Sequence, residues 1–528
     1  MKQPTPSVAF DEGKIDGIFA HLNQCHLPGA AVGIAIGGRP VYRKGFGLAN
    51  MELPVVLSPS TRMRVYSVTK HFTCLAYMLL CEDGKASIDD PIGRHFPEFH
   101  RATGKVSMRQ LMGNISGIRD AHGLHFQFSG TQWTAPSSQV IQLYETLDDV
   151  DAEPGTSWSY NSGGFVLISH AIERITGKTL GEVMRERIFE PVGMPDTLLR
   201  RTDIDFVPGS ASMHMTSPGG GFIKSFIGGD RSGTGGIVST VNDMLCWLRH
   251  MDAPMVGNPD TWSLLKAPQT LANGTSTGYG LGLMRDSYRG VETLHHPGGG
   301  MGANAQMLKV PSAGLDVAIM VNREDVSSRD LSLKILDAVL PDLQVVREAP
   351  AEPCVSGLFR SPATGRVIRL LAEQGRQVAQ IGGFFPLPFA ADADGVLRTA
   401  KTAILPYKYS ITPIGDRENP AALRYEEYGN VDELVRVEPA RTQDVGQIAG
   451  HYRYEAAGFD VRISDAGMLT TGRFGSVLYS LECLAQEIWR VRDEKSLAIF
   501  QTGILVFDAT GFRFWSSCAH GLPFRRVG

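Results

Sequence analysis

The sequence has no long hydrophobic run and no surplus of positive charge. None of its apolar stretches approaches the roughly 18 residues of a membrane-spanning helix, and Met1 to Gly17 lacks a hydrophobic signal region. A formal net charge of −4 with interspersed signs leaves no basic face for nucleic acid. We therefore expect a cytoplasmic protein that binds neither membranes nor nucleic acid.

Paired cysteines and metal-ligand motifs are also missing. The seven cysteines are odd in number and scattered, which favours reduced, mostly buried thiols over a disulfide framework. The 14 histidines form no HxxxH or HExxH pattern, so the spacing of a zinc site is absent. The sequence thus predicts an activity that uses no metal and no other cofactor.

The chain does have the length and composition of a folded protein with several domains. Its 528 residues, 43% of them hydrophobic, exceed what one core usually supports. Helical periodicity and glycine-rich connections dominate the first two-thirds, and short strand-like segments follow. We predict a catalytic domain over residues 1–342, a linker over 343–352, and two β domains over 353–440 and 445–528.

The two C-terminal segments look like copies of one unit. Gly357-Leu358-Phe359-Arg360 matches Gly450-His451-Tyr452-Arg453, and later positions match at the same offset. Many short strands with turn residues between them predict a closed antiparallel barrel or a sandwich in each copy. Closure would remove the exposed edges of these short strands.

Ser67-Val68-Thr69-Lys70 places a hydroxyl and an amine one helical turn apart. Residues at i and i+3 share a helix face, so the Lys70 amine can lie beside the Ser67 hydroxyl. A serine becomes a nucleophile when a base takes its proton, and burial can lower the pKa of a lysine enough for that role. The pattern recurs at Ser263 to Lys266, but only Ser67 follows an apparent hairpin and precedes apolar residues at helical spacing. Ser67 and Lys70 thus predict a covalent hydrolase.

A tyrosine at a polar turn is the candidate for the second proton carrier. Tyr160-Asn161-Ser162 leads into an apolar helical segment. A phenol beside the Lys70 ammonium would lose its proton well below its ordinary pKa, and the two groups would titrate as a coupled pair.

A histidine before a glycine run is the next candidate. His296-Pro297-Gly298-Gly299 reads as a turn that enters a strand at Ala303. Glycines let a substrate approach the backbone, and the N–H groups of Ser67 and Gly299 would form an oxyanion hole. His296 should be largely neutral at pH 7, which disfavours a free C-terminal carboxylate on the substrate.

In this order, Ser67-x-x-Lys70, Tyr160-x-Ser162 and His296-x-Gly298 resemble the S-x-x-K, Y-x-N and H-x-G elements of the serine β-lactamase and penicillin-recognising family. The resemblance implies an α+β catalytic domain, with an antiparallel sheet flanked by helices, ahead of the two small antiparallel β-barrels. It implies that Ser67 is the nucleophile, Lys70 its proton acceptor and Tyr160 a proton carrier. Ser162 departs from the usual asparagine, which makes Asn161 an adjacent candidate for substrate contact.

The two β units narrow the resemblance to the bacterial D-aminopeptidases of that family. This implies a homodimeric serine-type aminopeptidase that releases N-terminal D-amino acids from peptides, amides and esters through an acyl-enzyme. The loop that restricts the pocket in similar enzymes would be Asp493-Glu494-Lys495-Ser496 here. The glycine-rich run Pro218 to Gly236 is the other candidate for the rim, because it is too flexible to be core. The candidates for holding the substrate amine are Asp120, Asp230 and Glu494.

Two other functions remain open on the sequence. The same scaffold supports an esterase, an amidase, or a weak β-lactamase or DD-peptidase, because fold and nucleophile do not determine substrate. A non-catalytic peptide-binding protein is the alternative from a different class, against which the joint presence of Ser67, Lys70, Tyr160 and His296 argues.

Overall fold

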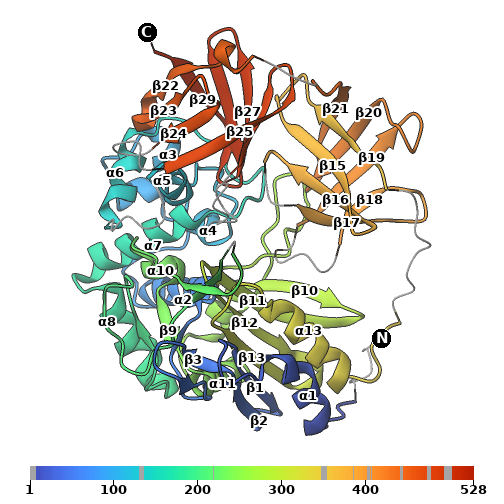
Figure 1. The fold of residues 1–528 in the computed structure, drawn as a ribbon. Helices are drawn as coiled ribbons and strands as arrows, with labels where there is room; N and C mark the ends of the chain where they lie inside the picture. Colours follow the sequence, from blue (N-terminus) through green and yellow to red (C-terminus); the bar gives the residue numbers. More distant parts are fainter. Residues whose placement is uncertain are drawn as a thin grey trace.

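The chain forms a helix-rich region with one large sheet, followed by two barrels (Figure 1). The computed structural model describes residues 7–129, 136–217, 219–345, 354–383, 386–400, 405, 407–440, 444–471, 477–492 and 502–527. No helix within these ranges is long and apolar enough to cross a membrane.

Six antiparallel strands form the sheet of the N-terminal region. In spatial order they are β10 (Met284–Tyr288), β11 (Val291–Gly300), β12 (Ala303–Val310), β13 (Leu315–Val321), β1 (Ala30–Ile36) and β2 (Arg39–Phe46). The hairpin expected around Gly37-Gly38 is present, and both glycines have positive φ. The run His296 to Gly299 is a different case, because it lies inside β11 and pairs with β12. The expectation of a turn there was wrong, since the reversal comes after Gly300.

Alternate residues of the strands face two separate cores. Val32 and Ile34 of β1 pack with the helices α1 (Glu12–Phe19) and α13 (Ser328–Val339). Ala31 and Ala35 face the opposite side, where α11 (Val241–His250) packs against β1 and β13. This period of two is what a sheet covered on both faces requires.

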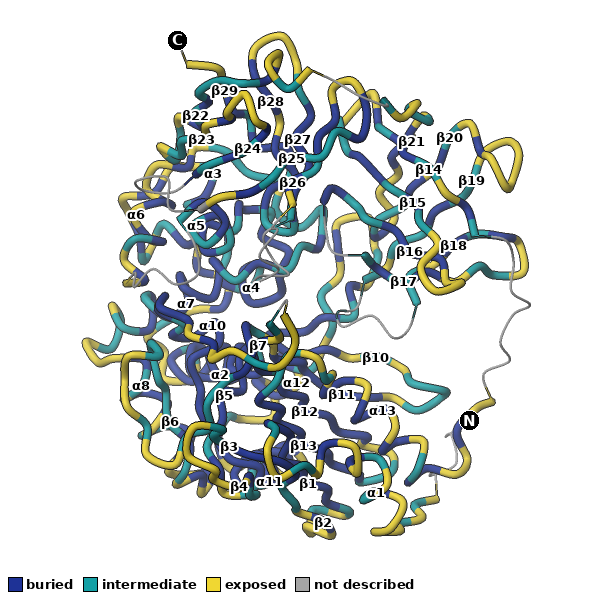
Figure 2. Tube along the Cα trace, viewed as in Figure 1, coloured by how far each residue is buried: buried dark blue, intermediate teal, exposed yellow. Residues whose placement is uncertain are grey.

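Helix α2 (Thr69–Glu82) lies at the centre of the helical layer. Every residue from Thr69 to Leu80 is buried, as the dark tube in Figure 2 shows. It packs against α7 (Ser162–Thr176), the short turn α10 (Ser232–Gly235) and α12 (Pro259–Lys266). The remaining α-helices are α3 (Arg101–Gly104), α4 (Met108–Met112), α5 (Ala121–Ser129), α6 (Ser138–Thr146), α8 (Leu180–Met184) and α9 (Glu190–Val192).

Two short strand pairs, β3-β4 and β7-β8, and a three-stranded sheet in the order β5-β9-β6 complete this region. They are formed by β3 (Leu48–Asn50), β4 (Val55–Val56), β5 (Met63–Arg64), β6 (Leu198–Leu199), β7 (His214–Thr216), β8 (Phe222–Lys224) and β9 (Ile237–Ser239). β5 pairs with β9, which places the segment before Ser67 beside the segment after α10.

The two C-terminal units are closed antiparallel barrels of eight strands each, which confirms the predicted fold class. The first contains β14 (Gly357–Arg360), β15 (Val367–Glu373), β16 (Arg376–Ile381), β17 (Leu387–Ala391), β18 (Leu397–Thr399), β19 (Tyr409–Ile414), β20 (Ala422–Glu427) and β21 (Asn430–Val437). The second contains β22 (Gly450–Tyr454), β23 (Phe459–Ile463), β24 (Met468–Thr471), β25 (Val477–Ala485), β26 (Ile488–Arg492), β27 (Gly503–Asp508), β28 (Gly511–Ser516) and β29 (Ala519–Arg526). The predicted domain limits, including the linker, stay predictions.

Both barrels contact the helical region. The first does so through Tyr428, whose carbonyl accepts a hydrogen bond from Asn273 Nδ2 at 2.9 Å and whose ring packs on Trp158. The second packs on α5, where the Phe128 ring lies 4.7 Å from Phe459. No disulfide joins the cysteines in the described ranges, where Cys74 is fully buried, Cys25 is exposed and the other five are half-buried. The expectation of mostly buried thiols was thus too strong.

Candidate active site

Ser67 lies in a single 3-10 turn that leads directly into α2. It is half-buried, with Tyr66 before it held at a φ of 48°. This turn presses against β11, where a Cβ at Gly298 would collide with the Val65 carbonyl and one at Gly300 with the Tyr66 ring. Glycine at these two positions lets the strand lie against the serine. Between them, Gly299 faces open space and is exposed.

Lys70 is fully buried beside this serine. Its Nζ donates a hydrogen bond to Ser67 Oγ at 3.1 Å and another to the Thr234 carbonyl at 2.8 Å. Burial lowers the pKa of Lys70 to about 7, and the negative charge of Asp120 partly opposes this shift. A lysine in this state can accept a proton near neutral pH.

The second Ser-x-x-Lys pattern, Ser263 to Lys266, shows no such arrangement. Ser263 is exposed on α12, and the Lys266 amine bonds instead to the Met251 carbonyl at 3.1 Å.

Tyr160 lies next to the lysine, with its ring centre 4.9 Å from Lys70 Nζ. Desolvation raises the pKa of this phenol above its ordinary value, although a side-chain hydrogen bond with Ser67 opposes the shift. The expectation of a lowered pKa was wrong, because a buried phenolate loses more hydration than the neighbouring ammonium returns. Tyr160 therefore carries its proton at neutral pH.

His296 is fully buried on the other side of Tyr160, with the two ring centres 6.3 Å apart. Its Nδ1 lies 2.6 Å from the Pro297 carbonyl, which can only accept, so Nε2 accepts from the Tyr279 hydroxyl at 3.1 Å. Burial lowers the pKa of His296 to about 3. The expectation of a neutral histidine is confirmed.

Asn161 and Ser162 occupy the start of α7. The Asn161 side chain caps the helix by accepting from the Gly164 N–H at 3.0 Å and donates to the Ile118 carbonyl at 2.8 Å. Asn161 is buried and both ends of its amide make internal hydrogen bonds, which disfavours a contact with substrate. Ser162 is half-buried and remains the better placed of the two.

Asp120, one of the acids considered for the substrate amine, lies close enough to Lys70 to act on its charge. It is partly exposed and accepts from the backbone N–H groups of Gly163 at 2.8 Å and Gly123 at 3.1 Å. Desolvation raises its pKa, while these N–H groups and Lys70 act against the rise. Cys518 from the second barrel lies against the same position, where a Cβ on Gly123 would meet both Cys518 and Asp120.

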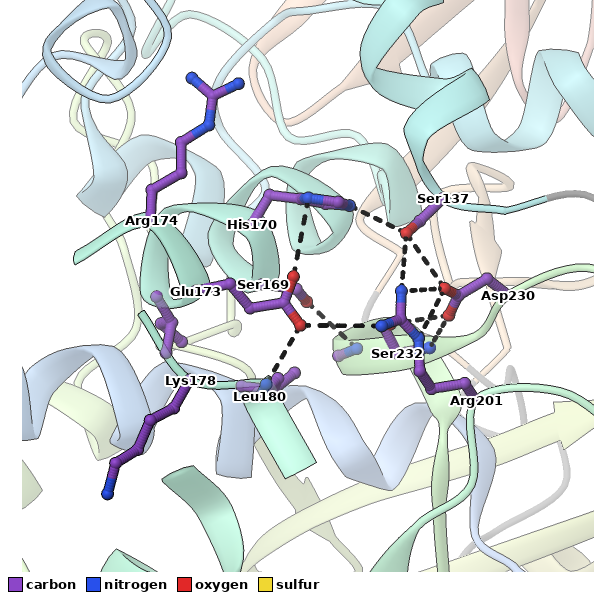
Figure 3. A network of polar contacts seen from close by, with 12 residues as sticks. Ser137, Ser169, His170, Glu173, Arg174, Lys178, Leu180, Arg201, Asp230 and Ser232 are labelled. Carbon is purple, nitrogen blue, oxygen red and sulfur yellow. Dashed lines mark hydrogen bonds and ion pairs between the residues drawn. The ribbon is translucent and has the colours of Figure 1, made fainter. Parts of the chain in front are cut away.

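Asp230 is committed elsewhere. Figure 3 shows it in a network with Arg201, Ser137 and Ser232, including an ion pair of 2.6 Å with Arg201. A buried carboxylate that is already paired offers no free charge to a substrate, so this candidate was wrong. Glu494, together with Asp493, Lys495 and Ser496, lies outside the described residues.

The glycine-rich run before Gly236 was expected to be a flexible rim, and its end is instead part of the core. Ser232 and Thr234 are each 3% exposed in α10, and a Cβ at Gly233 would collide with Ser169 Oγ. Glycine serves close packing here. The Thr234 carbonyl that holds Lys70 was missed, because a backbone acceptor leaves no mark on sequence composition.

The chain is similar to known proteins over most of its length. Residues 15–340 match the family described as Beta-lactamase. A D-aminopeptidase from Brucella anthropi is 28% identical over 523 residues, covering 95% of each chain. A second D-aminopeptidase, from Brucella melitensis biotype 2, is 27% identical over 525 residues and covers 95% of this chain and 96% of the relative.

Solved structures share the fold. The octameric penicillin-binding protein homologue from Pyrococcus abyssi superimposes with a TM-score of 0.58 at 20% identity, covering 80% of this chain and 100% of that one. A D-amino acid amidase from Ochrobactrum anthropi SV3, complexed with L-phenylalanine amide, gives 0.53 at 23% identity over 62% of this chain and 97% of the amidase.

Proposed function

The chain belongs to the beta-lactamase family, and on that premise we propose that it is a serine aminopeptidase that releases N-terminal D-amino acids from peptides, amides and esters. The observation that carries this is the 3.1 Å hydrogen bond from Lys70 to Ser67, formed by a lysine whose pKa is about 7. Support for D-configured substrates comes from the two D-aminopeptidases, whose similarity spans 95% of the chain and includes both barrels.

Acylation begins with proton transfer from Ser67 to Lys70. With a pKa of about 7, close to half of Lys70 is neutral at pH 7 and can accept the hydroxyl proton. Ser67 Oγ then bonds to the substrate carbonyl carbon, and the electron pair of the C=O bond moves to its oxygen. The N–H groups of Ser67 and Gly299 stabilise that oxyanion. Gly299 follows Gly298 on β11. Gly299 suits this role because it faces open space.

The leaving amine needs a proton when the C–N bond breaks. Tyr160 keeps its proton and hydrogen-bonds to Ser67, so it donates to the amine and is reprotonated by the Lys70 ammonium. Water then attacks the acyl carbon while Lys70 takes its proton, the bond from that carbon to Ser67 Oγ breaks, and the proton returns from Lys70 to Ser67. His296 stays neutral and holds Tyr279 in place.

Asp120 is the group for the substrate's ammonium. Its carboxylate accepts a hydrogen bond from Gly163 in the first turn of α7. It is partly exposed and lies close enough to Lys70 to raise that lysine's pKa. Ser162, in the first turn of α7, offers a hydroxyl to the substrate amide. The segment Asp493 to Ser496 as a pocket-restricting loop remains a proposal that comes from the resemblance alone.

Assembly and location complete the proposal. The resemblance implies a homodimer in the cytoplasm. Light scattering coupled to size-exclusion chromatography measures the mass, and a value other than about twice the chain's 57.4 kDa contradicts the dimer. Fractionation of the native host tests the location.

The p-nitroanilides of D-alanine and L-alanine, run beside a chromogenic cephalosporin and a p-nitrophenyl ester, test the activity. We expect release of p-nitroaniline from the D-compound and little from the L-compound. Ester cleavage without D-amide cleavage would favour an esterase, and cephalosporin opening alone would favour a β-lactamase. Activity that persists in pure Ser67→Ala protein would contradict the covalent mechanism.

A further inference from the structure

The guanidinium of Arg231 is a charged group that the proposed chemistry does not use. It lies over the Phe126 ring at 4.5 Å, and its Nε is buried with no hydrogen-bond partner in the part of the chain that the structure describes. The nearby carboxylates are occupied, because Asp230 pairs with Arg201 at 2.6 Å and Asp203 pairs with Arg64 at 2.7 Å. Across the described ranges, no carboxylate forms an ion pair with Arg231. A cation in such surroundings is normally paired.

His122 provides a second, independent observation at the same place. It is only 5% exposed, and its Nε2 has no hydrogen-bond partner among the described residues. Its ring packs edge-on against Phe126 with the ring centres 4.7 Å apart. Because Arg231 covers the same ring, Phe126 lies against two buried nitrogens, Arg231 Nε and His122 Nε2, that have no hydrogen-bond partner among the described residues.

The backbone of Arg231 is linked through Thr234 to Lys70, the proposed base. The Arg231 carbonyl accepts from Thr234 Oγ1 at 2.7 Å, and the Thr234 carbonyl accepts from Lys70 at 2.8 Å. Both Arg231 and His122 are close enough to Lys70 to interact with its charge. His122 also follows Asp120 by two residues at the start of α5.

We propose that Arg231 and His122 form an anion subsite that binds the C-terminal carboxylate of a short D-aminoacyl peptide. This rests on the proposed function. The planar guanidinium offers a carboxylate two parallel hydrogen bonds, and neutral His122 donates a third in the tautomer that carries its proton on Nε2. With Asp120 holding the ammonium, the site matches both charges of a dipeptide.

This subsite reverses the expectation from the sequence that a free C-terminal carboxylate on the substrate is disfavoured. His296 is neutral and cannot attract a carboxylate, which argued against substrates with a free C-terminus. Arg231 supplies the cation from a different element, so short peptides become preferred over amides.

Two substrates that differ only at the C-terminus test this: D-alanyl-glycine and D-alanyl-glycinamide. We expect wild-type kcat/KM to favour the free carboxylate by about tenfold or more, the usual range for a charged hydrogen bond. Arg231→Gln should bring the ratio of the two kcat/KM values to about one, and Arg231→Lys should keep part of it. Any effect of Arg231 on Lys70 acts on both substrates alike and cancels in the ratio. Arg249→Gln, an exposed arginine on α11, is the matched control and should leave the ratio unchanged.

A wild-type ratio near one, or a ratio that Arg231→Gln does not alter, overturns the proposal. If Arg231→Gln fails to fold, Arg231→Lys and His122→Phe take its place, and a ratio unchanged in both has the same meaning. If neither D-dipeptide is cleaved, the proposed function fails, and the subsite is tested by inhibition of p-nitrophenyl acetate hydrolysis. N-acetylglycine should then inhibit about tenfold better than N-acetylglycinamide in the wild type and equally in Arg231→Gln; equal inhibition in the wild type rejects the subsite.

Discussion

Replacing Lys70 with methionine should abolish activity and, at neutral pH, make the protein more stable. Lys70 is fully buried with a pKa of about 7, whereas an unfolded lysine has a pKa of about 10.4. Between these values the unfolded chain holds a proton that the folded chain lacks, so the wild-type free energy of unfolding rises with pH across this window. At pH 7 the difference destabilises the folded state by about 4 kcal/mol.

Methionine removes this penalty but also the hydrogen bonds to Ser67 and the Thr234 carbonyl, a loss of about 1.5 kcal/mol. The net expectation is a Lys70→Met protein that is about 2 to 3 kcal/mol more stable than wild type at pH 7. At pH 10.5 the proton penalty has nearly vanished, so the variant should be less stable by about 1 kcal/mol.

Guanidinium unfolding at pH 7 and at pH 10.5, followed by circular dichroism, measures both values. Because the chain has several parts, the comparison uses the transition that circular dichroism and tryptophan fluorescence report together. Lys334→Met, an exposed lysine on α13, is the control and should show no change of sign. A Lys70→Met protein that is less stable than wild type at pH 7 refutes the reasoning, as does a difference that is the same at both pH values.

Three further predictions concern the same site. Ser67→Ala should lower kcat/KM for D-alanine p-nitroanilide by at least about 10⁴-fold. Ser263→Ala, in the second Ser-x-x-Lys pattern, should leave kcat/KM unchanged. Equal effects of the two substitutions would contradict the choice of nucleophile. The kcat/KM for p-nitrophenyl acetate should fall about tenfold per pH unit below about pH 7, because Lys70 is then protonated and cannot accept the serine proton. A flat profile down to pH 5 would contradict this. His296, with a pKa of about 3, should add no break to the profile above pH 4. Gly298→Ala should destabilise the fold by about 3 kcal/mol, because its Cβ would collide with the Val65 carbonyl. Gly299→Ala should leave the unfolding midpoint unaltered, because its Cβ contacts no atom of the described residues. Similar midpoints for both variants would show that the strand does not press on the serine turn.

Local patterns predicted the parts of the molecule that local geometry controls. The hairpin at Gly37-Gly38 and the serine–lysine pair depend on residues a few positions apart, and both appear in the structure. Short strand-like segments and an internal repeat predicted two β units, each a barrel or a sandwich, and the family resemblance implied the barrels that the structure contains. In the same way, the neutral state of His296 followed from its ordinary pKa.

Errors arose where a distant segment decides the environment. The phenol of Tyr160 keeps its proton because surrounding elements exclude water, which the residues beside it in sequence do not reveal. The glycine run after His296 is strand because β12 pairs with it. Asp230 is unavailable because Arg201, on a separate segment, already neutralises it.

The sequence by itself determined the reaction chemistry, because Ser67 and Lys70 meet on one helix face wherever that helix forms. Only the tertiary structure decided the charge states and the partners. Burial of α2 lowers the pKa of Lys70, α10 brings the Thr234 carbonyl to it, and α5 places His122 across Phe126 from Arg231. Dehydration and long-range contacts set these properties, and both depend on which segments pack together rather than on which residues are neighbours in the chain.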